Sequence, residues 1–312
     1  MSEIPNKKKK LNKIIKEILI FFTIVVVTFI LLQIMELYED SFTRFQGVIL
    51  NDYYSYSNLN SAMKDTLGED SFEGNLREDF YRYVIRLVLD DINKQENEKV
   101  ATYNQLFNKE KTKVISETLD NPSAETEYKN SEDFHYLKIS DFTIGYTYDS
   151  ILKCEDLFTQ SKDLILDLQG NTGGYIQELN KVLGLFIADG EVTYTDKSDS
   201  EEKIYKAKSK QKIMFNKIYI LTDNNTASCA EVMILALKSN LNVTLIGQKT
   251  YGKNFSYVYE KFNDGYSLAL VSSVFCDKNG NTFPNGFEPD LPWQTSLDFS
   301  SAADIINENY KS

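Results

Sequence analysis

The sequence predicts an α/β fold, because short apolar runs alternate with turns and helical segments through its second half. Residues 163–168 and 217–222 are two such runs, each typical of a buried strand. Small polar residues or glycines follow each run, and a helical segment follows each turn. This order predicts a sheet with helices packed on it.

The first element is a basic segment followed by an apolar run. Residues 1–16 contain Lys7–Lys10, and Ile18–Met35 then gives 18 residues without a charge. At about 1.5 Å per residue such a helix nearly spans a bilayer core of about 30 Å. A buried helix and a cleaved signal peptide are the alternatives. Because Glu36–Asp40 lacks the small-residue pattern of a cleavage site, we expect an uncleaved transmembrane signal anchor at residues 17–35.

Charge sets the expected orientation of this anchor. Lysines precede it and acids follow it, so residues 1–16 are expected in the cytoplasm and the rest outside. The lysine run is suited to anionic lipid headgroups. The predicted location is therefore the cell membrane, single-pass, with an extracytoplasmic main domain. The net charge of −12 argues against a nucleic-acid partner.

Residues 36–130 are expected to form a helical N-terminal region. Leu76–Ile92 has a 3.6-residue apolar period that predicts one buried face, made of Phe80, Tyr83, Val84, Leu87 and Val88. Glu96–Lys113 is charged and predicted helical. Asp120–Glu125 contains proline and breaks the pattern, which indicates a boundary.

Residues 131–297 are the predicted core, and residues 298–312 a C-terminal helix and tail. Tyr136–Ile139 is its expected first strand. Gly190–Ser209 is expected to be a hairpin or loop, and Asp264–Gly265 the turn of a second hairpin. Helix is expected again over Ser300–Tyr310.

The turn at Gln169–Gly174 follows the strand at 163–168. Its glycines allow backbone N–H groups to approach a reacting carbonyl. A plain tight turn is the simpler interpretation. A phosphate-binding loop is weaker, because no Walker lysine follows.

Ser228 lies where the strand at 217–222 turns into the next helix. Unpaired N–H groups at a helix N-terminus stabilise negative charge, including an oxyanion forming beside the serine. The alternative is that Ser228 only caps the helix, which is common for serine.

Lys253 follows Ser228 by 25 residues, which is enough for a helix, a strand and a return. Lysine can serve as the base for a serine nucleophile. An ordinary lysine is neutral only about once in 2,500 molecules at pH 7, so this hypothesis requires a desolvated Lys253. The alternative is a solvated surface lysine.

Several blocks in this order resemble those of the carboxyl-terminal processing (tail-specific) serine proteases. The similarity covers roughly residues 136–293, and the blocks are Leu164–Gly174, Thr226–Glu231, Gly247–Lys253, Asp264–Gly265 and Gly286–Asp290. The resemblance implies a core that is a crotonase-like spiral of ββα units. It also implies Ser228 as nucleophile, Lys253 as general base, and an oxyanion hole from the N–H of Cys229 and one N–H of the Gly173–Gly174 turn.

The chain departs from that family in four places. The family often has a glutamine four residues after the lysine, where this chain has Tyr257, whose hydroxyl can also bond an amine. Gln169 stands in place of an arginine, and Thr172 in place of a proline. No segment resembles the family's PDZ domain.

The remaining chemistry-bearing residues favour structural roles. His135 is the only histidine and would have to be the base of a Ser-His mechanism. Cys154, Cys229 and Cys276 show no motif spacing, so neither a metal site nor a cofactor is expected. Cys229 is a conceivable nucleophile, but we expect it to be a small core residue.

The predicted function is that of a membrane-anchored serine endopeptidase acting outside the cytoplasm on a protein or peptide substrate. A catalytically weak or inactive peptide-binding module on the same fold is the main alternative. A crotonase-type acyl-thioester enzyme is a third, since one fold hosts many chemistries.

Overall fold

The computed structural model describes residues 43, 46, 49, 50, 56–120, 126–208 and 212–311. The chain divides into two compact units between Asp91 and Ile92. The anchor predicted at residues 17–35 lies outside the described residues. Within the described part, no helix has the length and apolar character needed to cross a bilayer.

The first unit contains α3 (Tyr56–Leu67) and most of α4 (Leu76–Asn93). The helix predicted over Leu76–Ile92 is confirmed, but its buried face is only partly as predicted. Phe80 is buried, whereas Leu87 and Val88 are about half exposed. The buried positions also include Asp79 and Arg82, which form an ion pair and are fully enclosed. The buried side of α4 is thus rotated away from Leu87 and Val88, and it includes two charged residues that lie outside the predicted apolar stripe.

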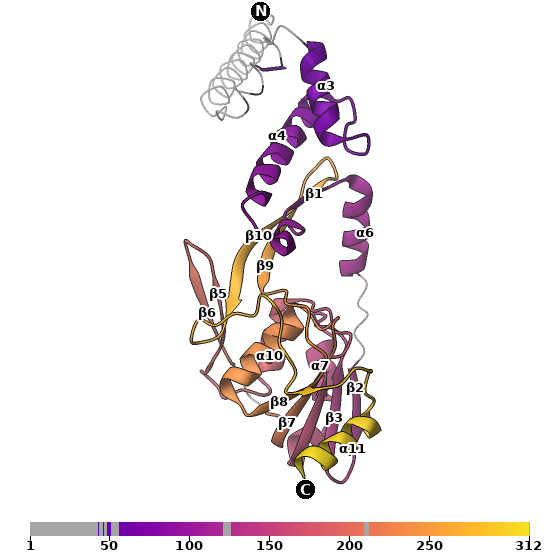
Figure 1. The fold of residues 1–312 in the computed structure, drawn as a ribbon, viewed down its shortest axis with the longest axis vertical. Coiled ribbons are helices and arrows are strands. Elements are labelled where there is room, and N and C mark those ends of the chain that lie inside the picture. The colour runs from indigo at the N-terminus through magenta and orange to yellow at the C-terminus, as the bar shows by residue number, and fades with distance from the viewer. Residues whose placement is uncertain are drawn as a thin grey trace, which may run out of the picture. The chain divides into compact units, whose positions relative to one another are not determined.

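The second unit contains two sheets and the helices that lie between their strands in the chain (Figure 1). In chain order they are α5 (Glu98–Ala101), β1 (Gln105–Phe107), α6 (Lys109–Asp120), β2 (Thr126–Asn130), β3 (Phe134–Ile139), α7 (Thr147–Leu152), α8 (Asp156–Thr159), β4 (Lys162–Asp167), α9 (Ile176–Leu183), β5 (Val192–Lys197), β6 (Glu202–Lys206), β7 (Phe215–Thr222), α10 (Cys229–Asn240), β8 (Val243–Gly247), β9 (Phe255–Lys261), β10 (Ser267–Cys276), β11 (Leu291–Pro292) and α11 (Phe299–Tyr310).

The larger sheet has six strands in the order β11-β8-β7-β4-β3-β2. Its strands run parallel except β2, which pairs antiparallel with β3. Successive side chains of a strand point to opposite faces. Leu164, Ile218 and Leu245 therefore share a core with α9 and α10, while Ile165 and Tyr219 pack with α11 on the other face.

The smaller sheet is antiparallel, in the order β1-β10-β5-β6, with β9 also paired to β10. The hairpins predicted at Gly190–Ser209 and around Asp264–Gly265 are β5–β6 and β9–β10. This sheet carries the loop that enters β9, which contains Lys253.

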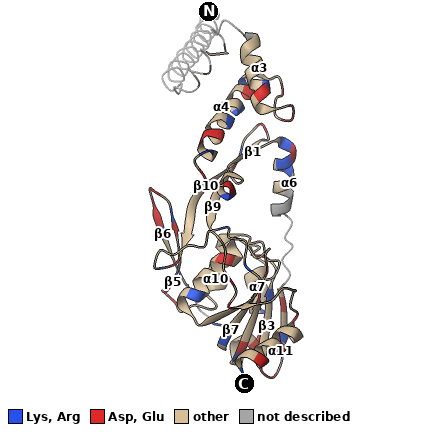
Figure 2. Cartoon of the chain, in the orientation of Figure 1, with Lys and Arg blue, Asp and Glu red and all other residues tan. Residues whose placement is uncertain are grey.

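Three expectations for residues 96–139 differ from the structure. Glu96–Lys113 is not one helix, because β1 forms within it by pairing with β10, far along the chain. Residues 126–130 belong to the sheet as β2 rather than to the helical region, and His135 lies inside β3 rather than before it. Acidic and basic side chains alternate along α4, whereas lysines predominate in the first half of α6 (Figure 2).

Candidate active site

Ser228 occupies a strained turn between β7 and α10. Its φ of 57° and ψ of −121° make it the only non-glycine residue with positive φ in the part of the chain described. Such a conformation costs about 1–3 kcal/mol and persists only where its surroundings hold it. The hydroxyl of Thr226 donates to the carbonyl of Leu168 at 2.9 Å, and Ala227 N–H donates to the carbonyl of Asn171 at 2.9 Å. These bonds fix the serine turn against the turn that follows β4.

Gly173 brings that second turn against the serine. A Cβ on Gly173 would lie 2.8 Å from Ser228 Cβ, closer than real Cβ atoms come, and 3.1 Å from Cys229 N, which is also tight. Its φ of +115° also favours glycine. The backbone therefore approaches Ser228 at a distance that a side chain would forbid.

The backbone donors near Ser228 differ in their availability. Gly173 N–H already donates to Asn171 Oδ1 at 2.9 Å. Gly174 N–H and Cys229 N–H have no acceptor among the described residues. Of the three residues predicted for the oxyanion hole, Cys229 and Gly174 thus keep open donors, while Gly173 supplies the close approach.

Lys253 lies in the loop that leads into β9. Its Nζ is 4.4 Å from the centre of the Tyr103 ring and 4.6 Å from the centre of the Tyr257 ring. Burial lowers the pKa of Lys253 below its ordinary value, partly offset by the nearby Cys229 and Glu231. This is the direction that a neutral lysine base requires. Within the described residues no hydrogen bond joins Ser228 Oγ to Lys253 Nζ; such contacts are often loose without substrate.

Glu231 connects the two loops, a role not foreseen from the sequence. Its buried carboxylate accepts from Ser228 N–H at 3.0 Å and from Lys253 N–H at 2.8 Å, through Oε2. Through Oε1 it accepts from Thr250 Oγ1 at 2.6 Å and Gly252 N–H at 2.5 Å. The signal available in the sequence was the S-x-x-E spacing from Ser228, which predicts the first bond as a capping box but none of the others.

Two of the residues that depart from the family pattern, Tyr257 and Gln169, have defined contacts near the site. Tyr257, the candidate for orienting the base, presents the face of its ring to the amine of Lys253. Gln169 is buried and bonds Asp167 Oδ1 at 3.0 Å and the carbonyl of Leu297 at 2.8 Å, while its Oε1 accepts from Leu297 N–H at 2.9 Å. Gln169 therefore ties the turn after β4 to the segment before α11.

Burial makes Cys229 a poor nucleophile. It raises the pKa of the Cys229 thiol to about 12, so the thiol is neutral near pH 7. Its Sγ lies 3.2 Å from the carbonyl oxygen of Gly174.

His135 is fully buried in β3. Its Nε2 lies 2.7 Å from the carbonyl oxygen of Gln160 and its Nδ1 2.9 Å from the Tyr128 hydroxyl. Both ring nitrogens thus have partners that are not part of the serine site. Among the residues described, no cluster of His, Cys, Asp or Glu could hold a metal ion.

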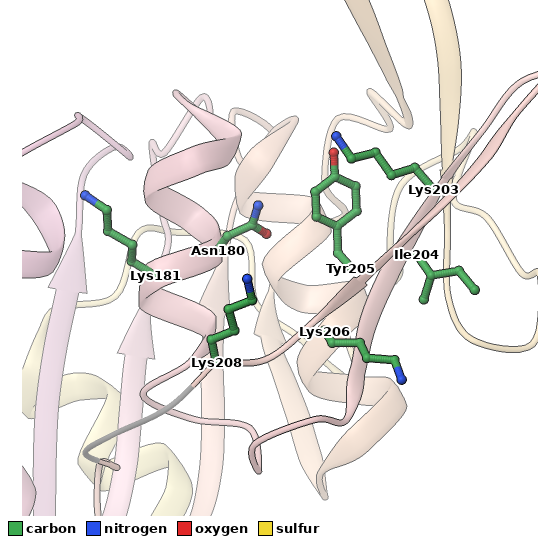
Figure 3. A pocket seen from close by; sticks show the side chains of 7 residues that line it. All are labelled: Asn180, Lys181, Lys203, Ile204, Tyr205, Lys206 and Lys208. Carbon is green, nitrogen blue, oxygen red and sulfur yellow. The ribbon is translucent and has the colours of Figure 1, made fainter.

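Two surface hollows accompany this unit. One, of about 580 Å³, borders the chain just after Lys253 and includes Asn254, Phe255 and Pro284 in its lining. The other, of about 560 Å³, lies between α9 and β6 and presents four lysines, Lys181, Lys203, Lys206 and Lys208 (Figure 3). Neither Ser228 nor Lys253 lines the second hollow, so it is separate from the serine site.

Comparison with known proteins gives a consistent picture. Residues 133–293 match the model of Peptidase family S41. The chain is 29% identical to "Carboxy-terminal processing protease CtpA" of Bacillus subtilis (strain 168), over 49% of this chain and 33% of the relative. It is 30% identical to "Probable CtpA-like serine protease" of Staphylococcus haemolyticus (strain JCSC1435), over 53% of this chain and 34% of the relative. The matched part thus spans about a third of the length of these relatives.

A solved structure shares the fold more widely. It is described as "Structure of a lipoprotein from Streptococcus agalactiae" and aligns with a TM-score of 0.52 at 22% identity. The alignment covers 83% of this chain and 99% of that one.

Proposed function

Because the chain belongs to peptidase family S41, whose serine peptidases use a Ser-Lys dyad, we propose that it is a membrane-anchored endopeptidase of the carboxyl-terminal processing type. One observation carries the proposal. The carboxylate of Glu231 holds the loops of Ser228 and Lys253 together, and Lys253 is desolvated there.

The proposed reaction is acyl transfer to Ser228 followed by hydrolysis. Neutral Lys253 takes the hydroxyl proton as Ser228 Oγ bonds to the peptide carbonyl carbon. The carbonyl oxygen becomes an oxyanion beside the N–H groups of Cys229 and Gly174, at the N-terminus of α10. Lys253 then gives its proton to the leaving amine as the C–N bond breaks. Water attacks the acyl-enzyme with Lys253 again as base, and Ser228 leaves with its proton restored.

Three further features belong to the same proposal. The core is a crotonase-like spiral of ββα units, supported by the order β4, α9, β5–β6, β7, α10 and β8. Residues 17–35 anchor the chain with residues 1–16 in the cytoplasm, supported by lysines before the apolar run and acids after it. The substrates are protein tails, supported by the similarity to the carboxy-terminal processing protease of Bacillus subtilis.

Cleavage by the full chain in detergent micelles tests the activity. Wild type should cut casein or an extended peptide, and a fluorophosphonate probe should label it. Ser228→Ala should lose cleavage and labelling, and Lys253→Ala should lose at least about 10²-fold in rate, as removal of a general base does. Protease digestion of sealed vesicles of each orientation tests the topology. Cleavage that persists at the wild-type rate in folded Ser228→Ala would refute the nucleophile.

A peptide-binding module without catalysis is the second candidate. It is favoured by one observation, namely that no hydrogen bond joins Ser228 Oγ to Lys253 Nζ in the described structure. It predicts peptide binding that survives in Ser228→Ala and no covalent labelling of wild type.

A further inference from the structure

The segment just before and including β1 reaches the site from outside the region matched to the family. We call residues 97–107 the strap. Its first fixed point is Lys99, whose Nζ donates to three carbonyl oxygens, those of Tyr251 at 2.9 Å, Gly252 at 3.2 Å and Pro284 at 3.2 Å. Two of these carbonyls belong to the two residues immediately before Lys253. Lys99 therefore fixes the strap directly to the loop that carries the proposed base.

The second fixed point is on the smaller sheet. Asn104 is buried, and its Oδ1 accepts from Val271 N–H at 2.7 Å. The next residues form β1, in which Gln105 pairs with Ala269 of β10. The strap is thus held at both ends, on either side of Tyr103.

Tyr103 lies between these points and covers the amine of Lys253. Its ring contacts Phe255 edge-on, with centroids 5.1 Å apart, and lies 6.2 Å from the Tyr257 ring at an interplanar angle of 34°. Lys253 Nζ lies 4.4 Å from the Tyr103 ring centre, which is within cation–π range.

We propose that Tyr103 is a positioning residue for the serine peptidase reaction, and that its ring and that of Tyr257 form an aromatic box around the amine of Lys253. The inference rests on the proposed function, since it concerns the same base. The strap supplies one wall of the box, so the site is incomplete without a segment that precedes the family region.

The box has two opposing effects on the protonation of the amine. A ring excludes water, which disfavours the ammonium form, and its negative face attracts the ammonium form. Of the other titratable groups near the amine, the carboxylate of Glu231 raises the pKa of Lys253, whereas the thiol of Cys229 would do so only once ionised. Tyr103 itself stays a neutral phenol, because burial and its hydrogen bond with Tyr251 raise its pKa.

Three substitutions separate these effects. Tyr103→Phe keeps the ring face and removes only the hydroxyl. Tyr103→Leu keeps water out but has no ring face. Tyr103→Ala opens the site to water. The matched control is Tyr310→Leu in the terminal helix. The ring of Tyr310 also makes a cation–π contact with a lysine, since Lys217 Nζ lies 4.7 Å from the ring centre.

The readouts are the pH profile of kcat/KM for the full chain and the titration of Lys253 by NMR of ¹³Cε-labelled lysine, assigned with Lys253→Arg. Tyr103→Phe and Tyr310→Leu should match wild type in both. Tyr103→Leu should move the acid limb and the Lys253 titration to lower pH by about 0.5–1.5 pH units, the range of a lost cation–π contact. Tyr103→Ala should move both to higher pH.

The outcomes separate this inference from the proposed function. The aromatic box is refuted if Lys253 titrates at the same pH in Tyr103→Leu as in wild type. It is also refuted if the Lys253 titration shifts as far in Tyr103→Phe as in Tyr103→Leu. If wild type cleaves nothing while the NMR shifts occur as stated, the box stands and the proposed function fails.

Discussion

Replacing Glu231 with glutamine should loosen both halves of the site through one side chain. The carboxylate accepts four hydrogen bonds, two on each oxygen. An amide keeps one acceptor oxygen and puts an NH₂ donor in place of the other. In the more favourable of the two amide orientations, the NH₂ group points toward Thr250, whose hydroxyl can accept a hydrogen bond. Gly252 N–H then faces a donor in place of Oε1, from which its nitrogen lies 2.5 Å in the wild type.

The magnitude follows from that one unpaired group. A buried N–H without an acceptor costs about 1–3 kcal/mol. The weaker hydrogen bonds of a neutral amide are offset by relief of the buried charge, because burial raises the pKa of Glu231. We therefore expect Glu231→Gln to lower the free energy of unfolding by about 1–3 kcal/mol, and to slow serine labelling because the two loops are no longer held together.

Glu178→Gln is the matched control. Glu178 is equally buried, and its Oε1 accepts from Tyr148 N–H at 2.8 Å, a bond that glutamine keeps. Its other oxygen pairs with Lys181 at 3.0 Å, a half-exposed lysine that can turn to water, so the loss is about 0–1 kcal/mol. Urea unfolding of the full chain measures both variants. If Glu231→Gln is as stable as Glu178→Gln and is labelled at the wild-type rate, the reasoning is refuted.

Three further predictions concern the same site. Lys253→Met should be more stable than wild type near pH 7, and the difference should vanish as pH rises to about 10.4. The reason is that the pKa of Lys253 is lower in the folded state, so that wild-type stability rises with pH up to the pKa of the unfolded state. Urea unfolding midpoints across pH test this, and a difference that stays constant with pH contradicts it. Ser228→Gly should be more stable than Ser228→Ala by about 1 kcal/mol in thermal unfolding, since only glycine accepts φ of 57° without strain; equal stability would show that the turn is not strained. Gly173→Ala should abolish fluorophosphonate labelling, because its Cβ would lie 2.8 Å from Ser228 Cβ, and normal labelling would mean that the two turns are not in close contact.

Local pattern was sufficient for the elements that flank the nucleophile. The runs at 163–168 and 217–222 correspond to β4 and β7, because their apolar residues fill both faces of a sheet covered by helices. The glycines after β4 and the small residues before α10 marked the two turns that meet at Ser228. Such features are encoded within a few residues of one another.

The features missed from the sequence all depend on contacts between distant segments. Strand β1 has no strand-like pattern of its own and forms because β10 offers a partner edge. The three bonds of Glu231 to residues 250–253 arise only when the helix and the next loop meet. Tyr103 lies in a charged segment without a motif, and nothing near it in the chain indicates that its ring covers Lys253.

The strap has a consequence for the order in which the protein folds. The carbonyls that Lys99 holds lie 152 to 185 positions away in the chain, so this contact closes a very long loop. Contacts of such separation carry a large closure entropy and form slowly, after more local pairings have assembled. We therefore expect the box around the base to be among the last parts of the unit to form, and a newly made chain to stay without an assembled site until its C-terminal half is in place.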